Sequence, residues 1–299
     1  MLRSQVQVRS MLGRNDFVDG PVSEEKKEID PIRAAEKVKG LACHLGADLV
    51  RIGPLNQAHV YSHVGNAISI ALETDIDLIK TGPVLPELLE IVRVYSQLAK
   101  ISVILAAYIR SLGFPARAHN SNNYQVLCIP IAIDAGMGEL SRMGALITRE
   151  LGPCLKLATV TTDLPLAYDP PVDIGVDEFC QDCKICAKNC PSGAIPYGGK
   201  VVVRGVEKWK IKPEACYRIW NETGTDCGIC IATCPWTKSG TMFHNLCKEI
   251  ASRKHKAGLW MSIGEELIYG KFRPKPAPDW MEIPDLSIWE KYKKLREHI

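Results

Sequence analysis

The sequence lacks any long apolar segment: its most apolar run, residues 101–109, falls far short of the roughly 20 residues that a transmembrane helix needs. It also lacks an excess of charge of one sign, because 37 Lys and Arg oppose 34 Asp and Glu, for a formal net charge of +3. Such a balance argues against a strongly basic nucleic-acid module and against an acidic disordered tail. We therefore expect a globular protein with no transmembrane segment and no nucleic-acid partner.

The first nine residues contain neither a twin-arginine pair nor an apolar stretch, so they show no export signal. We expect a cytoplasmic protein, or a membrane-associated or exported form only if a signal has been removed. Cysteine, by contrast, is abundant, with 12 in the chain. So many cysteines without a signal peptide favour metal ligation over a disulfide scaffold.

Eight of the cysteines crowd into residues 180–234. The first four follow the spacing C-x2-C-x2-C-x3-C-P, which is typical of bacterial ferredoxins with [4Fe–4S] clusters. Three thiolates on a tight loop can bind three iron corners of one cubane, whereas the fourth, followed by proline, is directed to a second cubane. The motif therefore predicts two clusters that exchange their last ligands.

The second motif, C-x2-C-x3-C-P over residues 227–235, lacks a first cysteine, which leaves cluster 2 one ligand short. Cys216 is the nearby cysteine that can fill this position, and we assign it. Zinc is the alternative metal, but zinc ribbons use paired knuckles and fit two C-x3-C-P endings poorly. The predicted ligands are Cys180, Cys183, Cys186 and Cys234 for cluster 1, and Cys190, Cys216, Cys227 and Cys230 for cluster 2.

Helical and strand patterns are mixed over the roughly 170 residues before the clusters, which predicts an α+β layer domain. Asp30 followed by Pro31 is typical of a helix start, with an N-cap and a proline in the first turn. The expected helices are 31–46 and 85–112, and the expected strands are 48–52, 67–72, 116–118, 126–129 and 155–162.

A proline-rich connector over residues 163–171 separates this domain from the cysteine motifs. We expect an N-terminal arm over 1–29, an α+β domain over 30–173, a ferredoxin-like two-cluster domain over 174–240, and a C-terminal helical extension over 241–299, with a helix at 243–250. The glycine-rich stretch 130–144 suits a backbone that closely approaches a flat ligand, with simple turn chemistry as the alternative. The four remaining cysteines are expected to be small core residues.

Several motifs together resemble those of corrinoid-dependent reductive dehalogenases. They are I-A-I-D-A-G-M-G-E at 131–139 with Arg142 and Gly144, T-T-D-L-P-L at 161–166, F-C-Q-D-C at 179–183 with C-P-S-G-A-I at 190–195, and W-N-E at 220–222 leading into T-D-C-G-I-C at 225–230. The resemblance covers about two thirds of the chain, from residue 41 to 238. Epoxyqueuosine reductases are similar but more distant.

The resemblance implies a nitroreductase-like domain that binds a cobalamin or related corrinoid, with electrons arriving through two [4Fe–4S] clusters. It implies an organohalide substrate and a low-potential electron donor such as a ferredoxin, a flavodoxin or a membrane redox partner. In the family no protein side chain binds the cobalt. In agreement with this, none of the seven histidines lies in an Asp-x-His-x-x-Gly corrinoid motif.

The resemblance also assigns a proton donor, Tyr95, and a cation that activates it, Lys156. The chemistry is sound, since a phenol is a weak acid and a nearby cation stabilises the phenolate that remains after donation. Without the resemblance, Tyr95 would be read as a core tyrosine on an apolar helix face, and Lys156 as the solvated end of a strand. Both readings are open to a structural test.

Corrinoid or substrate contacts are expected from the polar loop 119–124, where Asn120 or Asn122 could serve, and from Arg142. A surface salt bridge is the alternative for Arg142. The region that builds the substrate channel in the family is reduced here to a few residues between 61 and 67. Two other functions therefore stay open: a corrinoid reductase of the epoxyqueuosine reductase type, and a non-catalytic dicluster electron carrier.

Overall fold

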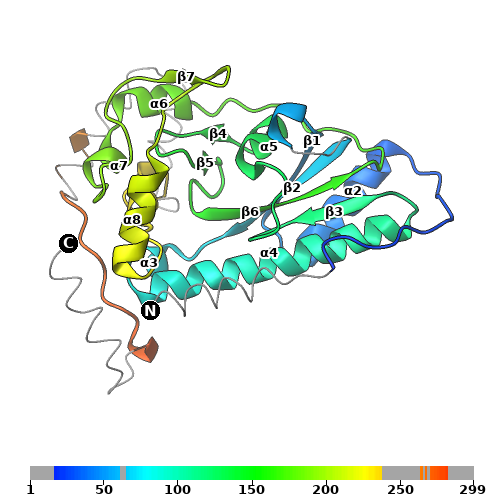
Figure 1. Ribbon diagram of the computed structural model, residues 1–299, viewed down its shortest axis with the longest axis horizontal. Coiled ribbons are helices and arrows are strands. Elements are labelled where there is room, and N and C mark those ends of the chain that lie inside the picture. The colour runs from blue at the N-terminus through cyan, green and yellow to red at the C-terminus, as the bar shows by residue number, and fades with distance from the viewer. Residues whose placement is uncertain (1–16, 61–64, 238–262, 265–266, 268–269, 282–299) are drawn as a thin grey trace.

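A four-stranded antiparallel sheet forms the centre of the protein in the computed structural model (Figure 1). The structure describes residues 17–60, 65–237, 263–264, 267 and 270–281. Part of the expected arm, the helix expected at 243–250, most of the C-terminal extension and most of the shortened channel region lie outside these residues. The strand order is β1 (Leu49–Pro54), β2 (Asn66–Glu73), β6 (Leu155–Thr162) and β3 (Ala116–His119).

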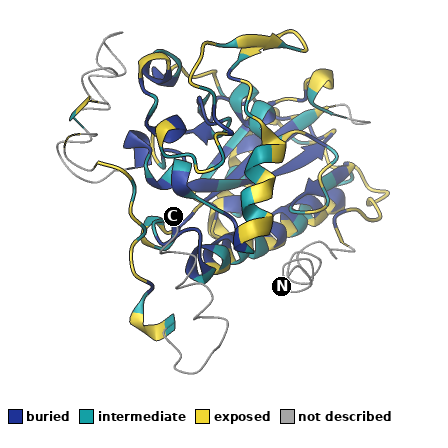
Figure 2. Cartoon of the chain, turned by 60° about the vertical axis from the view of Figure 1, so that its left-hand side comes forward, coloured by how far each residue is buried: buried dark blue, intermediate teal, exposed yellow. Residues whose placement is uncertain are grey.

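Helices cover both faces of this sheet. One face packs against α2 (Pro31–His44) and α4 (Leu85–Ser111), and the other packs against α5 (Cys128–Asp134). Along β6, Ala158 and Val160 belong to the core under α4, whereas Leu155 and Leu157 pack with residues of α5. Because side chains alternate along a strand, Lys156 lies on the α4 face. Figure 2 shows the strands buried between these layers.

The sequence predicted α2 and α4 correctly because both carry clear start and period signals. The Asp30 side chain accepts a hydrogen bond from the Arg33 N–H at 3.0 Å, and Pro31 occupies the first turn. The long helix α4 has its apolar stripe against the sheet, with Val94, Leu98 and Leu105 fully covered. No helix in the described part of the chain has both the length and the apolar character to cross a bilayer.

Removing the cap of α2 gives a simple stability prediction. We expect Asp30→Ala to lower the free energy of unfolding by about 1 kcal/mol, because the first-turn N–H groups lose their acceptor. Chemical denaturation of the apoprotein would measure this loss. Glu28→Ala, which removes an exposed carboxylate two residues earlier, is the control and should change stability by much less.

The strand expected at 126–129 is wrong. Val126 forms only an isolated bridge with Val60, and α5 begins at Cys128. A short apolar run does not distinguish a strand from a buried helix by its period, and Pro130 lies in the first turn of α5, where a missing N–H is tolerated. The segment is therefore a helix that covers the sheet rather than part of it.

The glycine-rich stretch after α5 is explained by contacts within the chain. A Cβ on Gly136 would lie 2.0 Å from the Pro170 carbonyl oxygen, and one on Gly138 would lie 2.1 Å from the Ile147 carbonyl oxygen. The φ angle of Gly136 is +71°, in the left-handed region. These two glycines thus serve turns and close backbone packing, in line with the turn-chemistry alternative. The short strands β4 (Glu139–Leu140) and β5 (Leu146–Ile147) follow them.

The cysteine-rich region packs at one end of the sheet (Figure 1). Its elements are short, as expected for a chain organised around metal ligands. They are the helices α6 (Val176–Asp182), α7 (Ile185–Lys188), α8 (Pro213–Thr223) and α9 (Ile229–Ala232), the hairpin of β7 (Val201–Val203) and β8 (Val206–Lys208), and the 3-10 turn η2 (Pro235–Thr237). The remaining elements are the helix α3 (Ile76–Ile79) and the 3-10 turns η1 (Gln57–His59) and η3 (Asp279–Met281).

Candidate redox site

The structure brings together the four cysteines predicted for cluster 1. Cys180 lies on α6, Cys183 ends that helix, and Cys186 lies on α7. Cys234, more than 40 residues later, is close enough to interact electrostatically with all three. All four side chains are buried. The fold thus places Cys234 near the first three cysteines, where the predicted exchange of the last ligand requires it.

The four cysteines predicted for cluster 2 also come together. Cys216 lies on α8 and Cys230 on α9, and the Cys230 thiol interacts with both Cys216 and Cys190. The Cys227 thiol interacts with Cys230 and Cys216. Cys216 therefore lies where the incomplete second motif needs a ligand, while Cys190 crosses over from the first motif.

Burial gives most of these thiols a high affinity for their protons. It raises the pKa of both Cys180 and Cys230 to about 12. Without metal such thiols are neutral at pH 7, so binding iron must displace their protons. Within the described residues, no three His, Cys, Asp or Glu side chains are arranged to bind a single metal ion. The two sets of four cysteines are instead recognised by the electrostatic interactions among the thiols within each set.

Cys190 differs from the other cysteines because its environment favours the thiolate. Burial alone would raise the pKa of the Cys190 thiol, but hydrogen bonds from the Ser192 hydroxyl and from the N–H groups of Ser192, Ala194 and Ile195 lower it. The segment C-P-S-G-A-I thus wraps its backbone donors around one sulfur. This explains why the motif extends past the proline.

Tyr95 and Lys156 meet between α4 and β6. The Lys156 ammonium nitrogen lies 5.9 Å from the centre of the Tyr95 ring. Burial acts to lower the pKa of Lys156, but the negative charges of Tyr95, Asp226 and Glu87, when ionised, raise it above its ordinary value. Lys156 also lies within electrostatic reach of Cys230. The lysine is therefore close to the tyrosine and within electrostatic reach of one cysteine predicted for cluster 2.

The polar loop after β3 lies beside this pair. Asn120 is only 1% exposed, and its amide donates to the Ser102 hydroxyl at 3.3 Å, while its buried carbonyl oxygen Oδ1 has no hydrogen-bond partner among the residues that the structure describes. Asn122 is exposed and has a φ of +69°, in a turn closed by the bond from Asn123 N–H to Asn120 O. Of the two candidates, Asn120 has the buried orientation that a ligand contact requires.

Three residues of this site were missed from the sequence. The Tyr124 hydroxyl donates to the Leu157 carbonyl at 3.2 Å, on the stretch of β6 that β3 leaves unpaired. Burial, with a smaller effect from Tyr95, raises the pKa of Tyr124 well above its ordinary value. Glu87 and Asp226 are the other two. A carboxylate on the apolar face of α4, as at Glu87, was a usable signal.

Arg142 has a position that neither reading of the sequence anticipated. Its side chain is buried, with 2% of the residue exposed, and its guanidinium faces the loop of cluster 1. It donates to the carbonyl oxygens of Cys180 (2.9 Å), Gln181 (3.1 Å), Cys183 (3.1 Å), Pro196 (2.9 Å) and Gly198 (2.9 Å). The surface salt bridge is therefore wrong, and the expected corrinoid contact finds no support in this geometry.

The remaining cysteines divide by exposure. Cys154 is buried, and burial raises its pKa to about 11, in agreement with a core role. Cys128, the first residue of α5, is partly buried against the core. Cys43 is exposed on α2, so the expectation of a core residue is wrong there. Cys247 lies outside the described residues.

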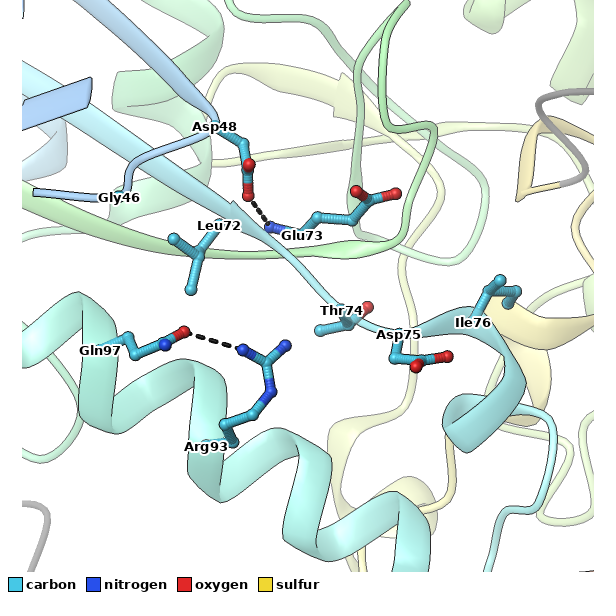
Figure 3. Close-up of a pocket in the computed structure, with 9 residues that line it drawn as sticks. All are labelled: Gly46, Asp48, Leu72, Glu73, Thr74, Asp75, Ile76, Arg93 and Gln97. Carbon is cyan, nitrogen blue, oxygen red and sulfur yellow. Dashed lines mark hydrogen bonds between the residues drawn. The ribbon is translucent and has the colours of Figure 1, made fainter. Parts of the chain in front are cut away.

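A hollow of about 510 Å³ opens between β2 and α4 (Figure 3). It contains none of the predicted site residues. Its acidic side chains are held by the protein itself: Asp48 accepts from the Glu73 N–H at 2.7 Å, and Asp75 caps α3. Burial, then Asp48 and Asp75, raise the pKa of Glu73. The redox site is thus distinct from this hollow.

The fold and the two sets of cysteines define an iron–sulfur redox protein. Residues 179–238 match the family described as a 4Fe-4S dicluster domain. More particularly, the chain is similar to reductive dehalogenases. The tetrachloroethene reductive dehalogenase of Sulfurospirillum multivorans is 32% identical over 265 residues, 72% of this chain and 52% of the relative. That of Desulfitobacterium hafniense is 34% identical over 194 residues, 61% of this chain and 35% of the relative.

Solved structures agree with the sequence relatives. The catabolic reductive dehalogenase NpRdhA matches with a TM-score of 0.79 at 28% identity, over 87% of this chain and 40% of that chain.

Among the sequence relatives, the epoxyqueuosine reductase of Aliivibrio fischeri is more distant, 26% identical over 149 residues, 48% of this chain and 38% of the relative. The resemblance inferred from the motifs is confirmed. The chain spans about half the length, or less, of the dehalogenases it matches.

Proposed function

We propose that this protein is a corrinoid- and [4Fe–4S]-dependent oxidoreductase that removes a halogen from an organohalide. The reaction takes two electrons and one proton and replaces the carbon–halogen bond by a carbon–hydrogen bond, with release of halide. One observation carries the proposal: the ammonium nitrogen of Lys156 lies 5.9 Å from the ring centre of Tyr95, the predicted proton donor, and Lys156 is also within electrostatic reach of Cys230, a predicted ligand of cluster 2. The predicted proton donor and a predicted ligand of the electron-supplying cluster are thus both near Lys156, at one end of β6.

The donor sets fit two iron–sulfur clusters. Each set has four thiols drawn from at least three separate elements, as cubanes with thiolate ligands require; the four of cluster 1 are buried, and the four of cluster 2 are half-buried. Cluster 2 is the one next to Lys156, so cluster 1 is the more remote of the two. We infer that electrons from a low-potential donor, such as a ferredoxin, a flavodoxin or a membrane redox partner, pass from cluster 1 to cluster 2.

The polar residues beside Tyr95 fit a corrinoid or its substrate. Within the described ranges Asn120 keeps a buried acceptor without a partner, which is costly unless a ligand satisfies it. When bound, a corrinoid supplies a reducible cobalt for removal of the halogen. The chain itself supplies the proton from the Tyr95 hydroxyl, and Lys156 stabilises the phenolate that remains. In this proposal, residues 30–173 form a nitroreductase-like corrinoid domain and residues 174–240 form the cluster domain.

Metal content tests the proposal. Protein purified without oxygen and reconstituted with iron, sulfide and cobalamin is expected to hold about eight iron atoms and about one cobalt per chain. With a low-potential reductant it should release halide from members of a panel of aryl and alkyl halides. Iron without cobalt uptake would rule out this enzyme and the epoxyqueuosine reductase alternative, and would leave the dicluster electron carrier. Cobalt uptake without halide release would favour a different corrinoid-dependent reduction.

A further inference from the structure

Arg142 brings an uncompensated positive charge to the loop of cluster 1. Its five acceptors are all backbone carbonyl oxygens, and no carboxylate pairs with it among the described residues. The guanidinium carbon lies 4.8 Å from the centre of the Trp209 ring, so an aromatic face covers the side that the carbonyls leave. Because five hydrogen bonds and the Trp209 ring fix the guanidinium, its positive charge stays beside the loop of cluster 1.

The same residue contacts a predicted ligand directly. The backbone N–H of Arg142 donates to the Cys180 sulfur, and the guanidinium charge also acts on the Cys186 sulfur. Both effects favour negative charge on these sulfurs. Hydrogen bonds to the sulfurs and the net charge around a cluster are two of the factors that set its reduction potential.

The surroundings of cluster 2 differ in the part of the chain that the structure describes. Its neighbouring cation, Lys156, interacts with Asp226 and Glu87, so carboxylates offset its charge. Among the described residues, the carboxylate that acts on Cys180 is that of Asp177, which forms an ion pair with Lys200. The two clusters thus lie in different electrostatic surroundings, even though both have four thiolate ligands.

Arg142 also belongs to the α+β domain rather than to the cluster domain. It lies between β4 and β5, on the same hairpin as Glu139, whose carboxylate accepts from the N–H groups of Ile174 (3.1 Å) and Val176 (2.6 Å). Glu139 therefore caps the start of α6 and Arg142 binds the carbonyls at its end. This hairpin holds the helix that carries Cys180 at both ends.

We propose that Arg142 is a positioning residue that raises the reduction potential of cluster 1 relative to that of cluster 2. The inference rests on the two-cluster part of the proposed function and is independent of corrinoid binding and of the substrate. Reduction of cluster 1 adds one electron, and hence one negative charge, beside the guanidinium. The fixed positive charge favours the reduced form, so cluster 1 accepts the electron that the external donor supplies before that electron passes to cluster 2.

Potentiometric titration with dithionite, followed by electron paramagnetic resonance, tests this on the holoprotein. We expect Arg142→Gln to lower the equilibrium constant for one-electron reduction of cluster 1 about tenfold, or about 59 mV. Arg142→Lys keeps the charge and should lower it less than about threefold. Arg51→Gln is the control. It removes an equal positive charge from β1, where Arg51 pairs with Glu150, and should change the reduction potential of neither cluster.

Each result has a clear reading. An unshifted cluster 1 in a fully loaded Arg142→Gln protein would overturn the proposal, and so would a tenfold fall in Arg142→Lys. Loss of cluster 1 from Arg142→Gln would reduce Arg142 to a structural residue and would also overturn it. If the wild-type protein shows no pair of clusters at all, the two-cluster assignment itself fails, which the spectrum of the unsubstituted protein reveals before any variant is made.

Discussion

Replacing Tyr95 by phenylalanine is expected to lower kcat for dehalogenation about 10²–10⁴-fold, because the reaction loses its proton donor. Iron and cobalt contents should stay at wild-type levels, since the ring remains in the core under the sheet and only the hydroxyl is removed. Halide release under saturating reductant measures the effect. The prediction depends on Lys156 lying 5.9 Å from the ring centre, where its charge can stabilise the phenolate.

Tyr108→Phe is the matched control, because Tyr108 lies on the same helix and packs against the same core. It should leave turnover unchanged. Lys156→Gln should lower turnover in the same direction as Tyr95→Phe, and Lys156→Arg should restore part of the activity by returning the charge. A Tyr95→Phe protein that keeps more than about a tenth of wild-type kcat, with both metals bound, would show that another group donates the proton.

How far the sequence could predict this site depends on how local each signal is. The cysteine sets could be predicted because ferredoxin spacing is a local pattern, and the crossing of Cys190 and Cys234, which stays a prediction, follows from the proline after each. The helices α2 and α4 were predicted from caps and period. Their positions, together with the strand β6, bring Tyr95 and Lys156 face to face.

The missed features depend on contacts between distant segments. Nothing local to Arg142 indicates that five carbonyls, up to 56 residues away, will surround it. The choice between Asn120 and Asn122 depends on a turn whose third residue takes a positive φ, and on the hydroxyl of Ser102 on the distant helix α4. The strand expected at 126–129 failed for the converse reason, because a short apolar run has no period of its own.

Cys216→Ser should remove cluster 2 or leave it incomplete, and the iron content should fall by up to about half. The position of Cys216 supports this expectation. It lies on α8 and interacts with Cys190, while the thiols of both Cys227 and Cys230 respond to its charge. Because cluster 2 is the cluster beside Lys156, turnover should fall to background even though Tyr95 is intact.

Cys43→Ser is the matched control, since this thiol is exposed on α2 and distant in sequence from both motifs. It should leave the iron content and both cluster signals unchanged. Spectroscopy separates the outcomes: Cys216→Ser should keep the signal of cluster 1, whose ligands it does not touch, and lose or alter that of cluster 2. Two unaltered clusters in Cys216→Ser would mean that a residue outside the cysteine motifs completes cluster 2. In that case a residue other than Cys216 would be the fourth ligand of cluster 2, and the arrangement of cluster 2 beside Lys156 would have to be derived again with that ligand.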